Sequence, residues 1–266
     1  MRKLLMLLVC FILVGIVNSF AGEYPQRIWE LGPEVYYFKY REPGVMREKG
    51  IMYGLTGFYK YPIIDRFMLK AEGRAAGGTV DYKNSGTIDD ITDYTIELRG
   101  LVGYDFDASE SLGVMPYFGL GYRYLNDDTS GRSSSTGALG YERESNYLYS
   151  PIGLEVDRQL QKGWSIGAAL EYDIFWRGLQ KSHLSDANPS FNDVENTQTK
   201  GYGARGSIKL IKSQEAIDFV IEPFIRYWNI KRSEDSNVTF AGVIVGTGFE
   251  PKNNTVEAGI KVAARF

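Results

Sequence analysis

Apolar and polar residues alternate with a period of two along most of the chain after residue 21. This period is typical of β-strands that present one apolar face. In the clearest run, at the C-terminus, the apolar face holds Val256, Ala258, Ile260, Val262, Ala264 and Phe266. Glu257, Lys261 and Arg265 occupy the opposite face. A strand of a soluble sandwich also alternates, but it does not usually place charged residues on one face of nearly every strand.

The combination of an apolar and a charged face predicts a transmembrane barrel. No apolar stretch after Ala21 is long enough for a transmembrane helix. Apolar-out and polar-in alternation is what lipid outside and a polar interior require. Every backbone group in lipid must be paired internally, so such strands must close into a barrel. We therefore expect an all-β, antiparallel, up-and-down outer-membrane barrel.

The alternation predicts ten strands, near residues 33–42, 49–61, 65–77, 91–106, 113–126, 142–157, 163–177, 199–212, 216–231 and 254–266. If the N-terminus is periplasmic, the even-numbered connections should be short turns and the odd-numbered ones longer outer loops. The short ones lie near 62–64, 107–112, 158–162 and 213–215, and the long ones span 78–90, 127–141, 178–198 and 232–253. Only the first outer connection, residues 43–48, is short. Even strand number and alternating loop length agree, which predicts periplasmic N- and C-termini.

The N-terminus has the organisation of a signal peptide. Arg2 and Lys3 form a charged region, and an uninterrupted apolar run follows from Leu4 to Val17. Small residues then precede a cleavage site that we place after Ala21. The expected organisation is a signal peptide over 1–21, a periplasmic segment over 22–32 and the barrel over 33–266.

Composition narrows the possible chemistry. Aromatic residues make up 14% of the chain, which interface girdles such as Trp164 with Trp176 would explain. The net charge of −3, without a basic stripe, gives no electrostatic footprint for nucleic acid. Cys10, inside the predicted signal peptide, is the only cysteine. The mature chain therefore has no disulfide, thiolate metal site or cysteine nucleophile, and no motif predicts a cofactor.

Two short motifs resemble those of known barrels. The run ending in Val262, Ala264 and Phe266 resembles the C-terminal signal by which outer-membrane barrels are recognised for assembly. Residues 114–122, Val-Met-Pro-Tyr-Phe-Gly-Leu-Gly-Tyr, resemble a strand of small OmpA-like and opacity-type barrels, and residues 221–224 repeat its first half. The resemblance implies the fold, outer-membrane lipid and lipopolysaccharide as surroundings, and the assembly machinery as a partner. It implies no reaction.

The charged positions of the strands should face the lumen. The predicted lumen network is Lys70, Glu72, Arg74, Glu97, Arg99, Arg123, Glu155, Glu171, Asp173, Arg177, Arg205, Lys209, Glu222, Arg226, Glu257, Lys261 and Arg265, with Lys39 and Arg41 as further inward cations. Ten strands enclose a lumen near the size that side chains fill. Buried charges are costly unless paired, so a mixture of both signs favours a plugged barrel. The alternative is a narrow, charge-lined conduit.

A barrel of ten strands also resembles the omptin proteases, which have an Asp pair at one outer loop and an Asp-His pair at another. The chain has Asp89-Asp90 in the second outer connection and His183, its only histidine, with Asp186 in the fourth. Lys181 and Ser182 precede His183, so the Asp-x-His spacing is missing. The sequence favours a solvated loop histidine and assigns no catalytic residue.

The outer loops hold the remaining candidates. Asp89-Asp90 or Asp127-Asp128 could hold Ca²⁺ loosely, but the sequence predicts no specific metal site. Phe240, Val243, Ile244 and Val245 form an apolar run within an outer connection. This run either extends the last hairpin or forms a patch for a partner. We expect a surface-interaction barrel with a filled lumen; a narrow pore and an omptin-like rim protease are the alternatives.

Overall fold

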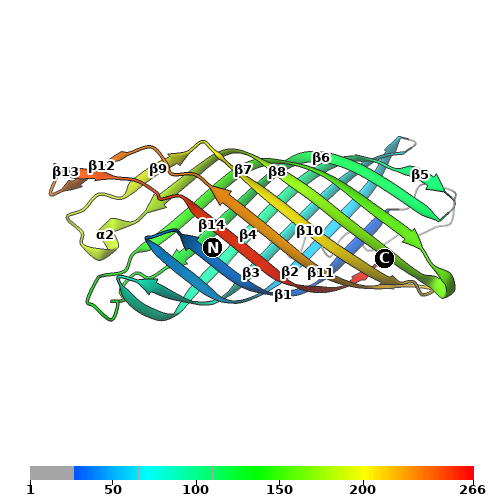
Figure 1. Ribbon diagram of the computed structural model, residues 1–266, viewed down its shortest axis with the longest axis horizontal. Coiled ribbons are helices and arrows are strands. Elements are labelled where there is room, and N and C mark those ends of the chain that lie inside the picture. The colour runs from blue at the N-terminus through cyan, green and yellow to red at the C-terminus, as the bar shows by residue number, and fades with distance from the viewer. Residues whose placement is uncertain (1–26, 65, 110) are drawn as a thin grey trace, which may run out of the picture.

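The computed structural model describes residues 27–64, 66–109 and 111–266, and within them ten long antiparallel strands close into a barrel. Around the wall the order is β1-β2-β3-β4-β6-β7-β8-β10-β11-β14. The ring closes because β14 pairs with both β11 and β1. The strands are tilted against the long axis, and β9, α2, β12 and β13 gather at one end (Figure 1).

The ten barrel strands are β1 (Ile28–Glu42), β2 (Met46–Ile64), β3 (Phe67–Asn84), β4 (Gly86–Tyr104), β6 (Leu112–Asp128), β7 (Glu142–Gln159), β8 (Trp164–Ser182), β10 (Gly201–Lys212), β11 (Asp218–Ile230) and β14 (Asn253–Arg265). The smaller elements are β5 (Phe106–Ser109), the 3₁₀ turn η1 (Gln161–Gly163), α2 (Leu184–Ala187), β9 (Val194–Gln198), β12 (Ser236–Phe240) and β13 (Val243–Gly248). Short β5 and β9 lie beside β6 and β8, and β12 and β13 form a separate hairpin.

The predicted fold class and all ten predicted strands are confirmed. The main difference at the N-terminus is that β1 begins at Ile28, so residues 28–32 belong to the barrel and not to a segment before it. The predicted signal peptide over 1–21 lies outside the described residues. No helix of the described part of the chain is both long and apolar enough to cross a membrane.

One predicted loop is wrong. Residues 78–90 were expected to form a long outer connection, but β3 runs to Asn84 and β4 starts at Gly86. Val80, Ile88 and Ile91 continue the inward apolar face and are buried in one cluster with Tyr36 and Phe38. A bulge at Val80 to Tyr82 restores the ladder. These inward apolar residues stabilise the extended hairpin, because exposing them in a loop would lose their burial.

The two ends of the barrel differ. Connections at one end, which we call the short-turn end, are brief, and residues 28 and 265 lie there paired with neighbouring strands. The other end, which we call the loop end, carries the connections with α2, β9 and the β12–β13 hairpin (Figure 1).

The outer wall is apolar and edged by aromatic rings. Leu55, Leu98, Phe118, Leu170 and Ile208 are among its exposed residues. Trp29 stacks on Tyr59 near the short-turn end, and a second set of rings includes Tyr94 with Tyr124 and Tyr172 with Tyr202. A spanning strand needs about 9–11 residues, whereas β2, β4 and β8 each have 19. The strands therefore extend beyond the apolar band.

Candidate functional site

Arg74 of β3 lies at the centre of the lumen and pairs with three carboxylates. Its Nε lies 2.8 Å from Glu97 Oε2, and its Nη1 lies 2.9 Å from Glu257 Oε2 and 3.3 Å from Glu34 Oε1. Arg123, which is fully buried, also pairs with Glu257, at 3.0 Å. These charges come from five different strands, so their ion pairs join opposite parts of the wall across the interior.

Two further arginines extend this network to the other side of the barrel. Arg205 of β10 pairs with Glu97 at 2.6 Å and with Asp173 at 2.9 Å. Arg226 of β11 pairs with Glu34 at 2.8 Å and with Glu257 at 3.2 Å. We call these residues the central layer: Arg74, Arg123, Arg205, Arg226, Glu34, Glu97, Asp173 and Glu257. The layer joins eight of the ten barrel strands, all except β2 and β7.

A second group of ion pairs fills the lumen toward the short-turn end. Lys70 pairs with Glu155 at 2.6 Å and Glu72 at 2.8 Å, and Lys261 pairs with Glu30 at 2.6 Å. The other pairs of this group are Arg99 with Glu72 and Glu171, Lys209 with Glu155, Lys261 with Glu222, and Arg265 with Glu30. A cavity of about 120 Å³ remains between this group and the central layer.

All the predicted lumen charges except Arg177 take part in these ion pairs. Arg177 is exposed on the outer wall. The register of β7 with β8 shifts between Leu148 and Tyr149, so Trp176 is an extra residue in β8. One extra residue in a strand reverses the face of every later side chain. The alternation read from the sequence therefore fails after Phe175.

The inward face of β1 was also assigned wrongly. Lys39 and Arg41 are exposed on the outside, whereas Glu30, Glu34 and Glu42 are buried. Starting the strand at residue 33 left Glu30 out of the pattern. The signal was present, since Glu30, Glu34, Tyr36, Phe38, Tyr40 and Glu42 all have even numbers and therefore share one face.

Aromatic rings cover the central layer on the side of the loop end. Tyr147, Tyr149, Phe175, Trp228 and Ile230 form a buried cluster. The Tyr149 hydroxyl donates to Glu97 Oε1 at 2.6 Å, and the Arg205 guanidinium lies 5.7 Å from the Trp228 ring. The ring of Tyr149 occupies the space above Gly121, where an added Cβ would lie 2.2 Å from Tyr149 Cζ. Gly121 of the Gly-x-Gly motif is thus needed for packing.

The lumen nearer the loop end is acidic, and sequence reasoning missed it. Arg143 Nη2 lies 2.6 Å from Glu42 Oε1 and 3.1 Å from Glu250 Oε1. The Tyr40 hydroxyl also contacts both carboxylates, at 2.9 Å each. Glu250 lies in the connection between β13 and β14. Burial raises the pKa of Glu250 to about 7, because the effect of Arg143 does not compensate for desolvation and the nearby Glu42.

Three more buried carboxylates belong to this region: Glu48, Asp93 and Asp127. Asp93 and Asp127 are directly opposite across β4 and β6. Asp93 is 1% exposed, and neither of its carboxylate oxygens has a hydrogen-bond partner among the described residues. Asp127 is 3.9 Å from Arg143. We call Glu42, Glu48, Asp93, Asp127, Arg143 and Glu250 the loop-end chamber.

The weak catalytic candidates are not brought together as the omptin resemblance implies. His183 follows β8, and its Nδ1 lies 3.0 Å from Asp193 Oδ2, not from Asp186. The Asp186 carboxylate instead accepts the backbone N–H of Glu142 at 3.0 Å. Asp89 and Asp90 lie on β4, where Arg132 donates to their backbone carbonyls. No hydrogen bond or ion pair joins this Asp pair to His183 within the described chain.

The Ser185 hydroxyl also belongs to the Asp193 site, and it donates to Asp193 Oδ1 at 2.6 Å. Burial opposes ionisation of Asp193, but the hydrogen bonds from Ser185 and the nearby His183 lower the pKa of its carboxyl. Because Asp193 lies between them, Ser185 donates to the carboxylate and not to the imidazole. The cluster therefore lacks the serine-to-histidine contact of a hydrolytic triad.

The predicted apolar run lies at the tip of the β12–β13 hairpin. Phe240 ends β12, Ala241 and Gly242 form the turn with positive φ, and β13 begins at Val243. Val243, Ile244 and Val245 are 59–66% exposed. Phe240 packs edge-on against Phe191, with ring centroids 5.0 Å apart. The run thus extends a hairpin and also presents an apolar surface.

The predicted assembly signal lies on the closing strand. Val262 and Phe266 are exposed on the outer wall, and Ala264 is half-buried. The backbone of Phe266 exchanges two hydrogen bonds with Trp29, at 2.7 and 2.9 Å. The C-terminus is thereby fixed at the strand that closes the ring.

A closed antiparallel barrel with an apolar outer wall, aromatic borders and a charged interior defines an outer-membrane β-barrel protein. Residues 46–210 match the model of the autotransporter beta-domain family. The chain therefore belongs to the autotransporter beta-domain family. This match supports the outer-membrane barrel that the short motifs imply, but it does not show their finer resemblance to the OmpA-like group. No curated protein sequence matches the chain.

One solved structure supports the fold, and two others are reported beside it. The outer membrane protease OmpT from Escherichia coli superposes with a TM-score of 0.59 at 11% identity, over 94% of this chain and 99% of that one. The translocator domain of the autotransporter NalP from Neisseria meningitidis gives 0.45 at 12% identity, over 100% and 95%. The toluene transporter TbuX from Ralstonia pickettii gives 0.37 at 12% identity, over 91% and 90%. At these identities the likeness to OmpT concerns the fold alone.

Proposed function

We propose that this protein is a closed outer-membrane barrel that acts through the surface of its loop end and does not conduct solutes through its lumen. The central layer supports this proposal most directly. Its ion pairs of Arg205 with Glu97, at 2.6 Å, and of Arg123 with Glu257, at 3.0 Å, join side chains from opposite walls. A continuous path for solute would have to break several of these pairs.

The energetics of buried ion pairs support a permanent closure. Separating one buried charge from its partners costs about 3–5 kcal/mol. Because Arg74 and Glu257 each have several partners, no single rotation of a side chain opens the layer. A polypeptide or helix passing through would need about 10 Å of free width, whereas the cavity lined by the central layer and the ion pairs near the short-turn end is only about 120 Å³.

The loop end is the surface that we assign to interaction. We place it outside the cell and both termini in the periplasm, which agrees with the short turns at one end and the three long connections, after β6, β8 and β11, at the other. The exposed Val243, Ile244 and Val245 at the hairpin tip would contact a partner or a lipid-like ligand. Val262, Ala264 and Phe266 would be recognised by the assembly machinery, and the apolar wall would contact lipid and lipopolysaccharide. The proposal contains no catalytic step.

Single-channel conductance of the refolded protein in a planar bilayer tests the closed lumen. We expect no steady conductance from protein whose folding is verified by its heat-dependent migration in gels. The charge-balanced variant Glu97→Ser/Arg205→Ser removes two bulky side chains from the central layer and should introduce a small steady conductance. Steady, ohmic conductance of the unmodified protein would overturn the proposal and favour the narrow pore.

The role of the hairpin needs a separate test. Val243→Ser/Ile244→Ser/Val245→Ser makes the tip polar without touching the barrel, and Leu139→Ser, at an exposed apolar residue of another loop-end connection, is the control. We expect the tip variant to lower adhesion of cells that display the protein to hydrophobic surfaces, with unchanged surface amounts. Equal adhesion of both variants and the unmodified protein would argue against the patch.

A further inference from the structure

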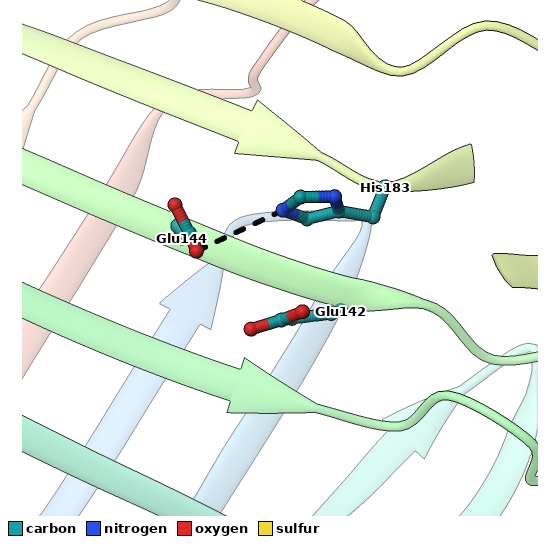
Figure 2. A group of neighbouring side chains, drawn as sticks. All are labelled: Glu142, Glu144 and His183. Carbon is teal, nitrogen blue, oxygen red and sulfur yellow. Dashed lines mark ion pairs between the residues drawn. The ribbon is translucent and has the colours of Figure 1, made fainter. Parts of the chain in front are cut away.

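Glu142, Glu144 and His183 form a compact group on the outer side of the loop end. One ligand atom from each lies within 4.8 Å of the others, and Glu144 Oε1 is 3.8 Å from His183 Nε2. Figure 2 shows the imidazole directed toward Glu144, with Glu142 beside it. Asn146, one step along the same face of β7, receives a hydrogen bond from Tyr122 of the aromatic border. Glu144 and Glu142 therefore lie just beyond the apolar band.

The imidazole is held in the orientation that a metal ligand needs. Asp193 Oδ2 lies 3.0 Å from Nδ1, so an Nδ1–H donated to this carboxylate leaves a lone pair on Nε2. Ser185 in turn fixes Asp193 by its hydroxyl and its backbone N–H. Nε2 is shielded from solvent and has no hydrogen-bond partner among the described residues. The Nε2 atom, Glu142 and Glu144 thus present one nitrogen and two carboxylates to the same point.

The two carboxylates are also positioned by neighbours. Asn126 donates to Glu142 Oε1 at 2.7 Å, and the backbone N–H of His183 donates to the Glu142 carbonyl at 2.9 Å. Glu142 and Glu144 are two apart on β7 and so share a face. Lys181 is opposite Glu144 in the β7–β8 register but makes no ion pair with it within the described chain. The Glu144 carboxylate is directed to His183 instead.

We propose that Glu142, Glu144 and His183 bind a divalent transition-metal ion, with Zn²⁺ the best match, and that Asp193 orients the histidine. Zn²⁺ takes histidine nitrogen and carboxylate oxygen in tetrahedral sites at about 2.0–2.2 Å, which separates neighbouring ligand atoms by about 3.4 Å. The observed 3.8 Å between Nε2 and Oε1 needs only small side-chain rotations to reach that value. A fourth position remains for water.

The bound ion would fix the loop that carries the interaction surface. His183 starts the connection between β8 and β9, which also contains Phe191 and Asn192. Asn192 Oδ1 accepts the backbone N–H of Thr239 at 2.6 Å, and Phe191 packs on Phe240. A metal joining β7 to this connection thus stabilises the support of the β12–β13 hairpin. The site itself stands independently of the function proposed above.

Calorimetric titration of Zn²⁺ into refolded, tag-free protein in detergent tests the site. We expect one ion per barrel, and His183→Ala should weaken binding at least about 100-fold, because it removes a ligand. Asp193→Asn should weaken it about 10–100-fold, the usual effect of losing the partner of a ligating histidine. Asp89→Asn/Asp90→Asn, a change at another acidic pair of the loop end, should leave the affinity unaltered. Co²⁺ in place of Zn²⁺ should give a tetrahedral absorption spectrum.

Several outcomes would overturn the proposal. The first is that the folded protein binds no Zn²⁺ at roughly 0.1 mM metal, which is near the weak end of specific binding. The second is that the His183→Ala variant binds Zn²⁺ as tightly as the unmodified protein. Binding of Ca²⁺ in preference to Zn²⁺ would also contradict it, since Ca²⁺ takes oxygen ligands and would not need His183. Because the variants lie outside the barrel lumen, heat-dependent gel migration should show that all of them fold.

Discussion

The central layer and the loop-end chamber are both buried and charged, but they differ in balance. In the central layer four arginines meet four carboxylates, and each carboxylate has an arginine within 3.3 Å. In the loop-end chamber Arg143 is the cation that pairs with the acidic side chains, and five carboxylates surround it. Asp93 has no partner for either oxygen within the described residues.

The difference shows which part of the lumen is built for permanent closure. Far from solvent, an unpaired charge is so costly that the sequence must supply its partner. The central layer meets this requirement with side chains from eight strands. The chamber meets it only in part, and Glu250, with its pKa raised to about 7, responds to pH near neutrality. We infer that the middle is rigid and that the chamber is the adaptable region.

Removal of one arginine from each region should give the largest contrast. Arg74→Ala leaves Glu34, Glu97 and Glu257 with fewer partners, and we expect it to lower the free energy of unfolding by about 3–5 kcal/mol. Arg143→Ala should cost only about 1–3 kcal/mol, because Tyr40 still donates to the chamber and Glu250 takes up a proton readily. Equilibrium urea unfolding in detergent, followed by tryptophan fluorescence, measures both. Equal losses would remove the distinction between the regions.

Neutralising one carboxylate in each region should give effects of opposite sign. Glu257→Gln weakens the pairing of Arg74, Arg123 and Arg226, so we expect a loss of about 1–3 kcal/mol in the same unfolding measurement. Asp93→Asn replaces an unpartnered buried carboxyl by an amide of the same shape that does not ionise, and should raise the stability by about 1 kcal/mol. If Asp93→Asn instead destabilises the barrel, the carboxylate has a partner that this reasoning has missed.

The smallest effect concerns the pH response of the connection that carries Glu250. A carboxyl whose pKa is raised on folding stabilises the folded state below its usual pKa of 4.5, and this contribution is lost as pH rises through about 7. As the pH rises from 5 to 8, we therefore expect residues 249–252 to become less ordered. Their protection factors against hydrogen exchange should fall roughly tenfold.

Glu250→Gln is the control for this pH response, because glutamine keeps the shape but does not ionise. The variant should show constant protection factors, after correction for the intrinsic rate of exchange, over the same pH range. A pH response that persists in Glu250→Gln would show that another group causes it.

Local patterns predicted most of the fold. Alternation of period two identified all ten barrel strands and most of the charges in the central layer and near the short-turn end, because the face of a strand residue depends only on its position parity. It did not identify the loop-end chamber. The prediction failed where an extra residue reverses the face of all later residues in a strand, and where the start of a strand was placed too late. The extra residue at Trp176 placed Arg177 outside, and the early start of β1 added Glu30 to the lumen. A bulge depends on the neighbouring strand, so the sequence of one strand does not reveal it.

The sequence by itself determined the barrel, its strand number and the mixed charge of its interior, because these follow from alternation and from the requirement that backbone groups in lipid be paired. Only the tertiary structure decided which charges meet. Arg226 and Glu34 are 192 residues apart, and the loop-end chamber combines β1, β2, β4, β6, β7 and the last connection. The group of Glu142, Glu144 and His183 likewise depends on the folding of one loop against β7. Such contacts arise from closure of the ring and from the packing of loops on it, and no local pattern encodes either.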